Sequence, residues 1–564
     1  MRREVTVASQ LYIQRNGTQI LHKLMAQLVE ATVEQHAYLP HMVTLRFQDP
    51  QLELLDGDTF DLGDTVTVSA KTSEGKIVSL FEGEVTALEP EFARGMLATY
   101  VVRGYDQAHR LFRQVKSCAF VNQKDSDIAK KIAQGIGLTA EVDDTRLVYD
   151  HVFQDNQSDL AFLQERAWRI GFECFVQGDK LLFRQPQNKG DGVVLEWGED
   201  LVAFYPRLTV AEQVDEVVVR GWNEGEQKAI VGRAENGRLY PRTQSYQNGA
   251  EVARQEFGRG KKIIVNQPVV SQAEANILAQ ARLDEVSGAF LQAEGEAFRR
   301  PDIRAGRVVA LKNLGQRLSG SYLVTAVTHS YTQLGLKSYF QVRGSRTGTI
   351  LEEMMQEQPT SRWSGVVPAV VTNNSDPQKL GRVKVQFPWL DEQVESDWAR
   401  LVGLGVVNGG GLTAVPAVGQ EVLVAFEQGD INQPFVLGGL WNGQHTPPAE
   451  VANTNDGEAN KVMTWRTASG HRVTLHDTTD NKIEIETASG HHIILDDTSN
   501  NKIGVETAGG HQLVLDDKTG TVTLKSSKDL AIEADANVKM KAGGNLDIEA
   551  TGKVTIKGQM INLN

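Results

Sequence analysis

The sequence that decides the fold repeats itself near the C-terminal end of the chain. Residues 467–486 read TASGHRVTLHDTTDNKIEIE, residues 487–506 read TASGHHIILDDTSNNKIGVE, and residues 507–526 read TAGGHQLVLDDKTGTVTLKS. Each 20-residue copy carries one histidine in the same place: His471, His491 and His511. Self-similarity at a fixed period is typical of repeat architectures, in which each unit stacks on the next.

After Gly520 the period shortens to eight residues. Each unit contains two apolar residues separated by one residue, and then Gly, Asn, Asp, Lys or Ser. The apolar pairs are Val522 with Leu524, Leu530 with Ile532, Val538 with Met540, Leu546 with Ile548, and Val554 with Ile556. Residues two apart in a strand face the same side, and the polar residues supply a corner. These ten residues are therefore the predicted core of a β-helix.

A single chain cannot enclose such a stripe. One short strand in each unit leaves unpaired edges, and a solenoid built from one chain needs about 20 residues or more in each coil. Three chains wound together solve both problems, because each chain supplies one wall of a triangular prism. The pattern predicts an intertwined triple-stranded β-helix in an obligate homotrimer over residues 462–564. An ordinary antiparallel meander is the alternative, and it does not explain the fixed period.

The histidines of the repeats allow two interpretations. Threefold symmetry would gather three copies of each ring, which suggests a metal site. However, the histidines lie a full repeat apart, follow Ser-Gly or Gly-Gly, and have no His-x-His neighbour. We interpret them as solvated turn residues, interpret Asp496-Asp497 and Asp516-Asp517 as turn carboxylates, and predict no metal and no cofactor.

The composition limits the partners of the chain. Its 564 residues are enough for several domains. The 58 Lys and Arg against 72 Asp and Glu give a net charge of −14, which argues against nucleic acid and against anionic membranes as resting partners. No window approaches 18 apolar residues, and residues 1–25 lack a continuous apolar stretch, so we expect no membrane helix and no signal peptide. Cys118 and Cys174 have no paired spacing and are expected to be buried.

Five short strand candidates follow one another between residues 363 and 443. They are 366–371, 382–387, 398–401, 421–426 and 435–440, and Gly or Pro separates them. Five such strands fit a barrel of the OB type. OB barrels often bind oligonucleotides through cationic grooves and aromatic side chains. Here Trp363, Trp389, Trp398 and Trp441 occur among abundant acidic residues, so a structural barrel is favoured over a nucleic-acid binder.

The residues of this barrel resemble a known family. Residues 374–389 read NSDPQKLGRVKVQFPW, 396–400 read SDWAR, 416–430 read PAVGQEVLVAFEQGD, and 434–443 read PFVLGGLWNG. In order and spacing these segments resemble the VgrG family and the spike proteins of phage baseplates. The resemblance implies a structural spike at the tip of a contractile injection machine, which punctures the target envelope when the sheath contracts.

The first 350 residues mix helices with strands. Helices are predicted over 124–137, where Asp125 or Ser126 would cap the start, and over 158–170. Ser271 and Glu274 form a capping box that predicts a third helix to about residue 286, charged enough to lie on the surface. With strands at 181–184, 216–220, 308–311 and 322–328, the segment is expected to form barrel-like α+β pieces.

Several phrases here resemble the hub of the same family. They are QDNQSDLAFL at 154–163, RIGFECF at 169–175, RAGRVVA at 304–310 and SGSYLV at 319–324. The resemblance implies a trimeric hub that meets the hexameric ring of the inner tube and the baseplate proteins. The first 60 residues differ from VgrG openings, which favours the related spike of extracellular or membrane-anchored particles.

The chain is thus expected to be mainly β with some α. We predict a hub over 1–355, an OB-fold barrel over 363–443, a linker over 444–461 and a β-helical needle over 462–564. The linker is too short for a catalytic domain, and no paired carboxylates, nucleophile elbow, P-loop or HExxH motif is present, so we predict no catalytic residues and no enzyme. We interpret His329 as a structural histidine.

The last residues suggest a platform for another protein. Met560, Ile561 and Leu563 form an apolar end without a His-x-His metal clasp, which predicts binding of a PAAR-like cap protein. The resemblance implies assembly in the bacterial cytoplasm and then a place in a phage tail-like particle, with only transient contact with the target membrane. The alternative is a phage or surface tailspike that binds or degrades polysaccharide, which would need carboxylate pairs along an exposed β-helix groove.

Overall fold

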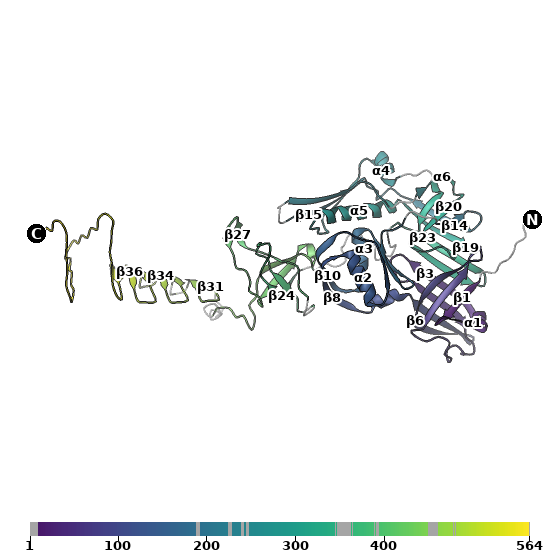
Figure 1. The fold of residues 1–564 in the computed structure, drawn as a ribbon, viewed down its shortest axis with the longest axis horizontal. Helices are drawn as coiled ribbons and strands as arrows, with labels where there is room; N and C mark the ends of the chain where they lie inside the picture. Colours follow the sequence, from purple (N-terminus) through teal and green to yellow (C-terminus); the bar gives the residue numbers. More distant parts are fainter. Residues whose placement is uncertain are drawn as a thin grey trace, which may run out of the picture. The chain divides into compact units, whose positions relative to one another are not determined.

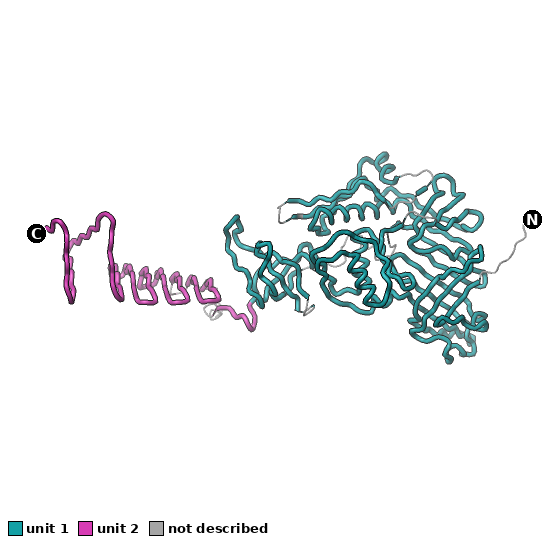
Figure 2. Tube along the Cα trace, in the orientation of Figure 1, with its two compact units in different colours: residues 1–440 teal, residues 441–564 magenta. Residues whose placement is uncertain are grey.

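The structure is a computed structural model, which divides into two compact units, residues 1–440 and 441–564 (Figure 2). It describes residues 10–187, 192–223, 228–238, 242–243, 248–344, 346, 363, 365–388, 390, 394–448, 461–477, 479 and 481–562. Strands predominate and helices are few (Figure 1), which confirms the predicted fold class of mainly β with some α.

The first half of the predicted hub is built from long antiparallel strands. They are β1 (Leu11–Arg15), β2 (Thr18–Gln19), β3 (Leu28–His36), β4 (Met42–Gln48), β5 (Thr65–Lys71), β6 (Ile77–Ala93) and β7 (Leu97–Tyr105), with the short helix α1 (His22–Gln27). Along β4, Val43, Leu45 and Phe47 are buried and the residues between them are more exposed, which is the two-residue period of a strand with one face in a core. These side chains pack in the core of this half.

The second half continues the same sheet. Its strands are β14 (Leu201–Leu208), β19 (Leu291–Phe298), β22 (Ala326–Thr332) and β23 (Gly335–Val342), and β22 pairs with β3. A smaller sheet contains β13 (Val193–Glu196), β17 (Arg242–Thr243), β20 (Val308–Lys312) and β21 (Gly320–Leu323), beside helix α6 (Gly315–Leu318). The strand predicted over 322–328 is therefore two strands, because β21 belongs to the smaller sheet and β22 to the larger one.

An α+β lobe follows the first half. It contains the 3-10 helix η1 (Gln107–Phe112), β8 (Val115–Lys124), α2 (Asp125–Gly135), β9 (Thr139–Val142), β10 (Val148–Ser158), α3 (Asp159–Ile170), β11 (Glu173–Gln177) and β12 (Lys180–Arg184). Helix α3 begins as predicted, since Ser158 Oγ accepts a bond from the Ala161 amide at 3.3 Å. The predicted cap of α2 is wrong: Lys124 takes the N-cap position without a side-chain bond, and Asp125 instead pairs with Arg166 at 2.6 Å.

A second lobe belongs to the other half of the hub. It contains β15 (Glu216–Asn223), β16 (Lys228–Ala234), α4 (Gly249–Phe257), β18 (Lys261–Ile264) and α5 (Gln272–Gly288). The capping box is confirmed, because Ser271 Oγ accepts a bond from the Glu274 amide at 3.1 Å. The prediction of a surface helix is wrong. Leu278 and Leu283 of α5 are buried with β15 and β16, and Arg282 lies buried over the ring of Trp168. Charge alone misled the prediction because long charged side chains can be buried when they are paired or stacked.

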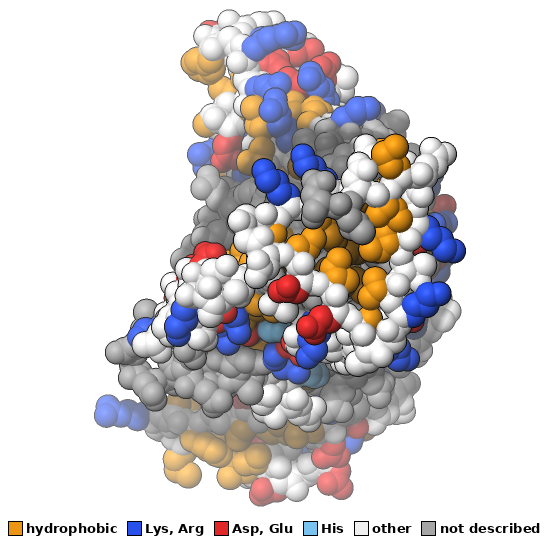
Figure 3. Space-filling model, turned by 90° about the vertical axis from the view of Figure 1, so that its left-hand side faces the viewer, with side chains coloured by type: hydrophobic (Ala, Val, Ile, Leu, Met, Phe, Trp, Pro, Cys, Tyr) orange, Lys and Arg blue, Asp and Glu red, His pale blue; other side chains and the backbone are white. Residues whose placement is uncertain are grey.

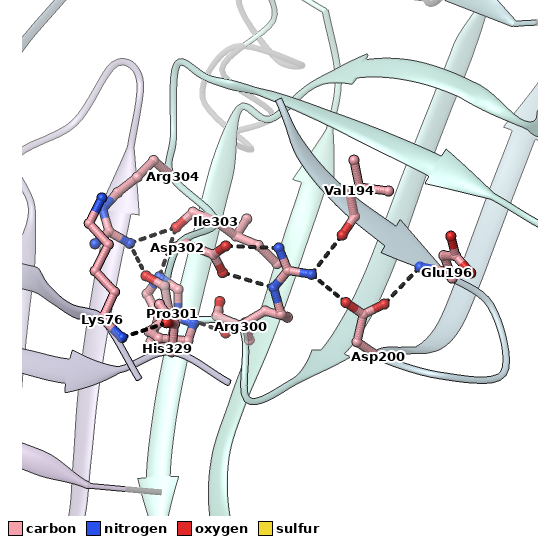
Figure 4. A network of polar contacts seen from close by, with 12 residues as sticks. Lys76, Val194, Glu196, Asp200, Arg300, Pro301, Asp302, Ile303, Arg304 and His329 are labelled. Atoms are coloured by element: carbon pink, nitrogen blue, oxygen red, sulfur yellow. Dashed lines mark hydrogen bonds and ion pairs between the residues drawn. The ribbon is translucent and has the colours of Figure 1, made fainter. Parts of the chain in front are cut away.

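Polar contacts hold the turn before β20 against its neighbours (Figure 4). Arg300 pairs with Asp302 at 2.8 Å and also with Asp200, and Arg304 donates to the Ile303 carbonyl at 2.8 Å. The ring of His329 is buried and contacts Ser338 Oγ at 2.8 Å and the Ile303 carbonyl at 3.1 Å. This confirms the interpretation of His329 as a structural histidine.

The barrel contains all five strands predicted for it. They are β24 (Val366–Asn373), β25 (Lys384–Gln386), β26 (Arg400–Leu401), β29 (Glu421–Phe426) and β30 (Pro434–Gly439), with the 3-10 helix η2 (Glu427–Gly429). In the sheet their order is β25-β24-β29-β30-β26. Phe153 of β10 packs into the barrel core, and its amide donates to Asn432 Oδ1 at 2.8 Å, which joins barrel and lobe. A further hairpin, β27 (Leu404–Val407) with β28 (Gly410–Leu412), was not predicted.

The second unit contains one antiparallel sheet. Its strands are β31 (Val462–Arg466), β32 (Arg472–His476), β33 (Lys482–Glu486), β34 (His492–Asp496), β35 (Lys502–Glu506), β36 (Gln512–Asp516) and β37 (Thr521–Lys525). Neighbours in sequence are neighbours in the sheet, so each 20-residue repeat supplies two strands and two turns. Residues 526–562, as described, contain no helix or strand.

Candidate assembly interface

The strand register of the second unit aligns its apolar side chains in two columns. One column contains Trp465, Val473, Ile485, Ile493, Val505, Leu513 and Leu524. The other contains Met463, Leu475, Ile483, Leu495, Ile503, Leu515 and Val522. Because the two residues of each strand are two apart, both columns lie on the same face of the sheet. We call this surface the apolar face.

One chain leaves this face open. From β33 to β36 the side chains of both columns are between 38% and 46% exposed, although all of them are Ile, Leu or Val. Contiguous apolar surface of this kind marks an interaction site in a folded protein. Within one chain the strands pair as the alternative, an antiparallel meander, would have it, since each strand pairs with its neighbours in sequence. This pairing provides no cover for the apolar face.

The predicted β-helix core residues fall into two groups. Val522 and Leu524 lie on β37 at the end of the apolar face. The other eight lie in the segment without strands and are half or more exposed: Leu530, Ile532, Val538, Met540, Leu546, Ile548, Val554 and Ile556. Figure 3 looks onto the C-terminal end of the drawn chain and shows hydrophobic side chains gathered around a hollow. Of the predicted cap-binding residues, Met560 and Ile561 are exposed and Leu563 lies outside the described residues.

The opposite face of the sheet is mostly polar and internally paired, although Ile494 and Val514 also lie on it. Glu484 lies 3.1 Å from both Lys482 and His476, and 3.7 Å from His492. Partial burial opposes ionisation of Glu484, but hydrogen bonds from Lys482 and His476 hold its pKa below the usual value. The two faces therefore differ in kind, and only the apolar face lacks a cover.

The turns of the repeats are joined to one another by the in-register histidines. Within a turn, the His471 amide donates to Thr467 Oγ1 at 3.1 Å and the Gly470 amide to the Thr467 carbonyl at 2.9 Å. The ring Nδ1 of His471 then accepts a bond from the Ala488 amide, 17 residues further on, at 3.2 Å. Their interpretation as exposed turn residues is confirmed. The sequence interpretation missed the bond from each histidine to the next repeat, although the fixed spacing between each histidine and the next turn indicated it.

The same contact recurs along the stack. His491 Nδ1 accepts from the Ala508 amide at 3.4 Å, and His511 Nδ1 from the Ser527 amide at 3.3 Å. The turn carboxylates lie on the other side of the sheet and accept hydrogen bonds within their own turns. Asp496 Oδ1, for example, accepts a bond from the Thr498 amide at 3.0 Å. The turns on both sides of the sheet are thus stabilised by hydrogen bonds between side chains and the backbone.

The barrel carries one strongly bonded loop. The buried carboxylate of Asp376 accepts bonds from the Gln378 amide at 3.0 Å and the Leu380 amide at 2.9 Å, and it binds Arg382 through both oxygens at 3.0 and 3.1 Å. Hydrogen bonds from Arg382 hold the pKa of Asp376 well below its usual range. The sequence interpretation did not single out this carboxylate at the centre of the turn.

A cavity of about 120 Å³ lies between the α+β lobe and the barrel. Its two arginines are already engaged: Arg166 pairs with Asp125 at 2.6 Å and Arg169 with Glu274 at 2.8 Å. The cavity therefore belongs to the packing of the junction. Among the described residues, no group of three or more His, Cys, Asp or Glu side chains could hold a metal ion, and no helix is both long and apolar enough to cross a bilayer.

Family models match two segments of the chain. One, described as the Alg8 N-terminal domain, matches residues 9–333, and another, described as the type VI secretion system/phage-baseplate injector OB domain, matches residues 367–441. A β-rich hub, an OB barrel and a repeat region in this order define a VgrG-like spike protein. The first model covers more than half of this chain, so the chain belongs to the Alg8 N-terminal domain family.

Curated relatives match over shorter stretches. The spike protein VgrG4b of the Pseudomonas aeruginosa type VI secretion system is 38% identical over 104 residues, which is 17% of this chain and 13% of that protein. The actin cross-linking toxin VgrG1 of Vibrio cholerae is 24% identical over 233 residues, 36% of this chain and 21% of that protein. The chain thus spans less than a quarter of the length of these relatives.

Solved structures share the fold. An Escherichia coli component of the type VI secretion system, described as similar to the T4 tail proteins gp27 and gp5, matches 76% of this chain and 99% of its own at a TM-score of 0.50 and 15% identity. The lidded Francisella PdpA–VgrG complex matches 92% of this chain and 80% of its own at a TM-score of 0.51 and 8% identity. At these identities the likeness concerns the fold.

Proposed function

We propose that the chain forms the homotrimeric central spike of a contractile injection machine. The observation that carries this proposal is the apolar face of the second unit. Two columns of apolar side chains, which are all Ile, Leu or Val from β33 to β36, run the length of the sheet and stay open in one chain. Three such faces turned toward a common axis would enclose one core, in which each aliphatic side chain contributes on the order of 1 kcal/mol once its exposed half is covered.

The needle (residues 462–564) would transmit the force of sheath contraction. Each strand between β31 and β37 bonds to both neighbours, and the histidine contacts join successive turns at the edge. Deforming one repeat therefore requires several bonds to break together. This suits a part that must pass through an envelope without unfolding, and it needs no catalytic chemistry, so the proposed role is structural rather than enzymatic.

The hub would dock to the hexameric ring of the inner tube and to baseplate proteins. Support comes from the family match over residues 9–333 and from relatives named as type VI secretion system spike proteins. We further propose assembly in the bacterial cytoplasm, followed by a place in a phage tail-like particle. At the other end, the exposed Met560 and Ile561, with Leu563, would bind a PAAR-like cap protein.

The test is the mass of the full-length protein in solution, measured by light scattering, with two matched variants. Ile493 and Ile494 are adjacent residues of the same type on opposite faces of β34. We expect a trimer for the unchanged chain, loss of the trimer for Ile493→Asp, where three carboxylates would meet in the core, and a retained trimer for Ile494→Asp. A folded monomer at micromolar concentration would contradict the proposal.

A further inference from the structure

The hairpin β27–β28 of the barrel has no visible support. Its register pairs Leu404 with Leu412 and Val407 with Gly410, and within the described residues no third strand joins this sheet. An isolated two-stranded hairpin is only marginally stable in water. Something other than its own hydrogen bonds must therefore stabilise this hairpin.

The hairpin and its flanks are apolar and exposed. The exposed aliphatic side chains are Val402, Leu404, Val406, Val407, Leu412, Val415 and Val418. No charged residue occurs from 401 to 420, whereas the 23% charged content of the chain would place about four or five in 20 residues. So many exposed apolar side chains in one segment indicate a surface that a binding partner covers in the functional protein.

We propose that this hairpin is a second contact between copies of the chain, in which it packs against the same hairpin of the neighbouring copies around the trimer axis. The proposal rests on the proposed trimer and names a further part of its interface. This contact would be made by the barrel and is separate in sequence from the apolar face of β31 to β37.

Symmetry explains why the occupant is a second copy. Around a rotation axis each side chain near the axis meets its own equivalents, so any charge there would face a like charge. A partner of different sequence imposes no such restriction, because its opposite charges can pair with those of the hairpin. The complete absence of charge over 401–420 is what a self-contact requires.

The covalent connection between the hairpin and the needle strengthens such a contact. The hairpin precedes β31 by about 50 residues, so chains joined through their needles hold their hairpins at a high effective concentration. Gly409, at the hairpin end between β27 and β28, has a positive φ of 73°, which glycine adopts without strain in a tight turn. Asn408 is the one residue with a side chain from 408 to 411, so neighbouring backbones can approach this end closely.

Disulfide trapping tests the contact directly. In a Cys118→Ser background of the full-length chain, Val406→Cys should form covalently linked dimers within the trimer on mild oxidation. Leu380→Cys, exposed elsewhere on the same barrel, serves as the matched control and should stay uncrosslinked. A trimer without cross-links at Val406 would overturn this inference and leave the proposed spike intact. A monomeric mass would overturn the trimer itself.

A charge test provides a second measurement. Val407→Asp should raise the concentration at which the trimer dissociates by at least tenfold, because three carboxylates would meet, and Leu380→Asp should leave it unchanged. Equal dissociation of Val407→Asp and the unchanged chain would overturn the inference. The inference would also be overturned if the unchanged trimer co-sedimented with phosphatidylcholine vesicles and Val407→Asp abolished this binding. In that case lipid would cover the hairpin.

Discussion

At the scale of single residues, Asp376 shows how one carboxylate can organise a loop. It accepts bonds from backbone amides and from Nε and Nη2 of Arg382 within seven residues of sequence. The loop leads into β25, whose Val385 lies in the barrel core. Asp376 thus links a local turn to the packing of the barrel.

We expect Asp376→Asn to lower the stability of the barrel by about 2 kcal/mol at pH 7, because charge-assisted bonds to a buried group are lost. The pKa of Asp376 is held below its usual value, so its contribution is present in full above about pH 4 and is lost as the pH falls through the lower folded value. Urea unfolding should show a constant difference from pH 8 to pH 5 that shrinks below pH 4.

The control for this experiment is Glu395→Gln. Glu395 is about half exposed and lies 3.7 Å from Lys384, a surface pair of little energetic weight. We expect a change below about 0.5 kcal/mol. An equal effect of the two substitutions, or a difference that grows as the pH falls, would contradict the role given to Asp376.

At the scale of elements, the three turns that begin at Thr467, Thr487 and Thr507 do more than reverse the chain. Each closes on itself through a threonine and then receives the amide of the next turn on a histidine nitrogen. The contact repeats at His491 and His511 because the period of the sequence repeats. The turns therefore form a hydrogen-bonded column beside the ladder of the strands.

We expect His491→Ala to speed hydrogen exchange at the Ala508 amide by about 3- to 10-fold, since that amide loses its acceptor, a bond worth on the order of 1 kcal/mol. Hydrogen exchange measured by mass spectrometry on peptides covering the turn checks this. His491→Asn, whose side-chain oxygen can replace Nδ1, should restore much of the protection. His492→Ala, one residue away on β34, should leave Ala508 unchanged, and equal effects of the two alanine variants would show that the column does not exist.

At the scale of the whole molecule, one chain contains parts that fold in different ways. The hub and barrel enclose their own cores around residues such as Phe47, Tyr322 and Val424. Among its described residues the second unit has no comparable core, because most of its aliphatic residues point to an open face. The first unit therefore has its own source of stability, whereas under the proposed trimer the needle would depend on assembly.

We expect deletion of residues 559–564 to abolish binding of a PAAR-like cap protein and to leave the trimer intact. The deleted residues include Met560 and Ile561, which are exposed, and none of the ten predicted core residues. Co-elution with the cap on a sizing column, together with the mass of the spike, measures both effects. Retention of the cap by the shortened chain would place its binding site elsewhere.

Local patterns were enough to predict several elements. Helices α3 and α5 follow from their caps and periodicity. Helix α2 and the five strands of the barrel sheet follow from periodicity and turn residues, all of which act within a few positions of sequence. The domain limits proposed from the sequence, and the assignment of the ten needle residues to a shared core, stay predictions. The burial of α5 could not be predicted, because the surfaces that cover it come from distant strands.

The sequence by itself determined the β-rich class, the barrel and the repeat with its apolar pairs, because these depend on spacing along the chain. The tertiary structure decided which residues meet across it: the two columns of the apolar face, the histidine that receives an amide 17 residues away, and the uncharged hairpin without a supporting strand. Register and burial arise from contacts between distant segments, and no local pattern specifies them.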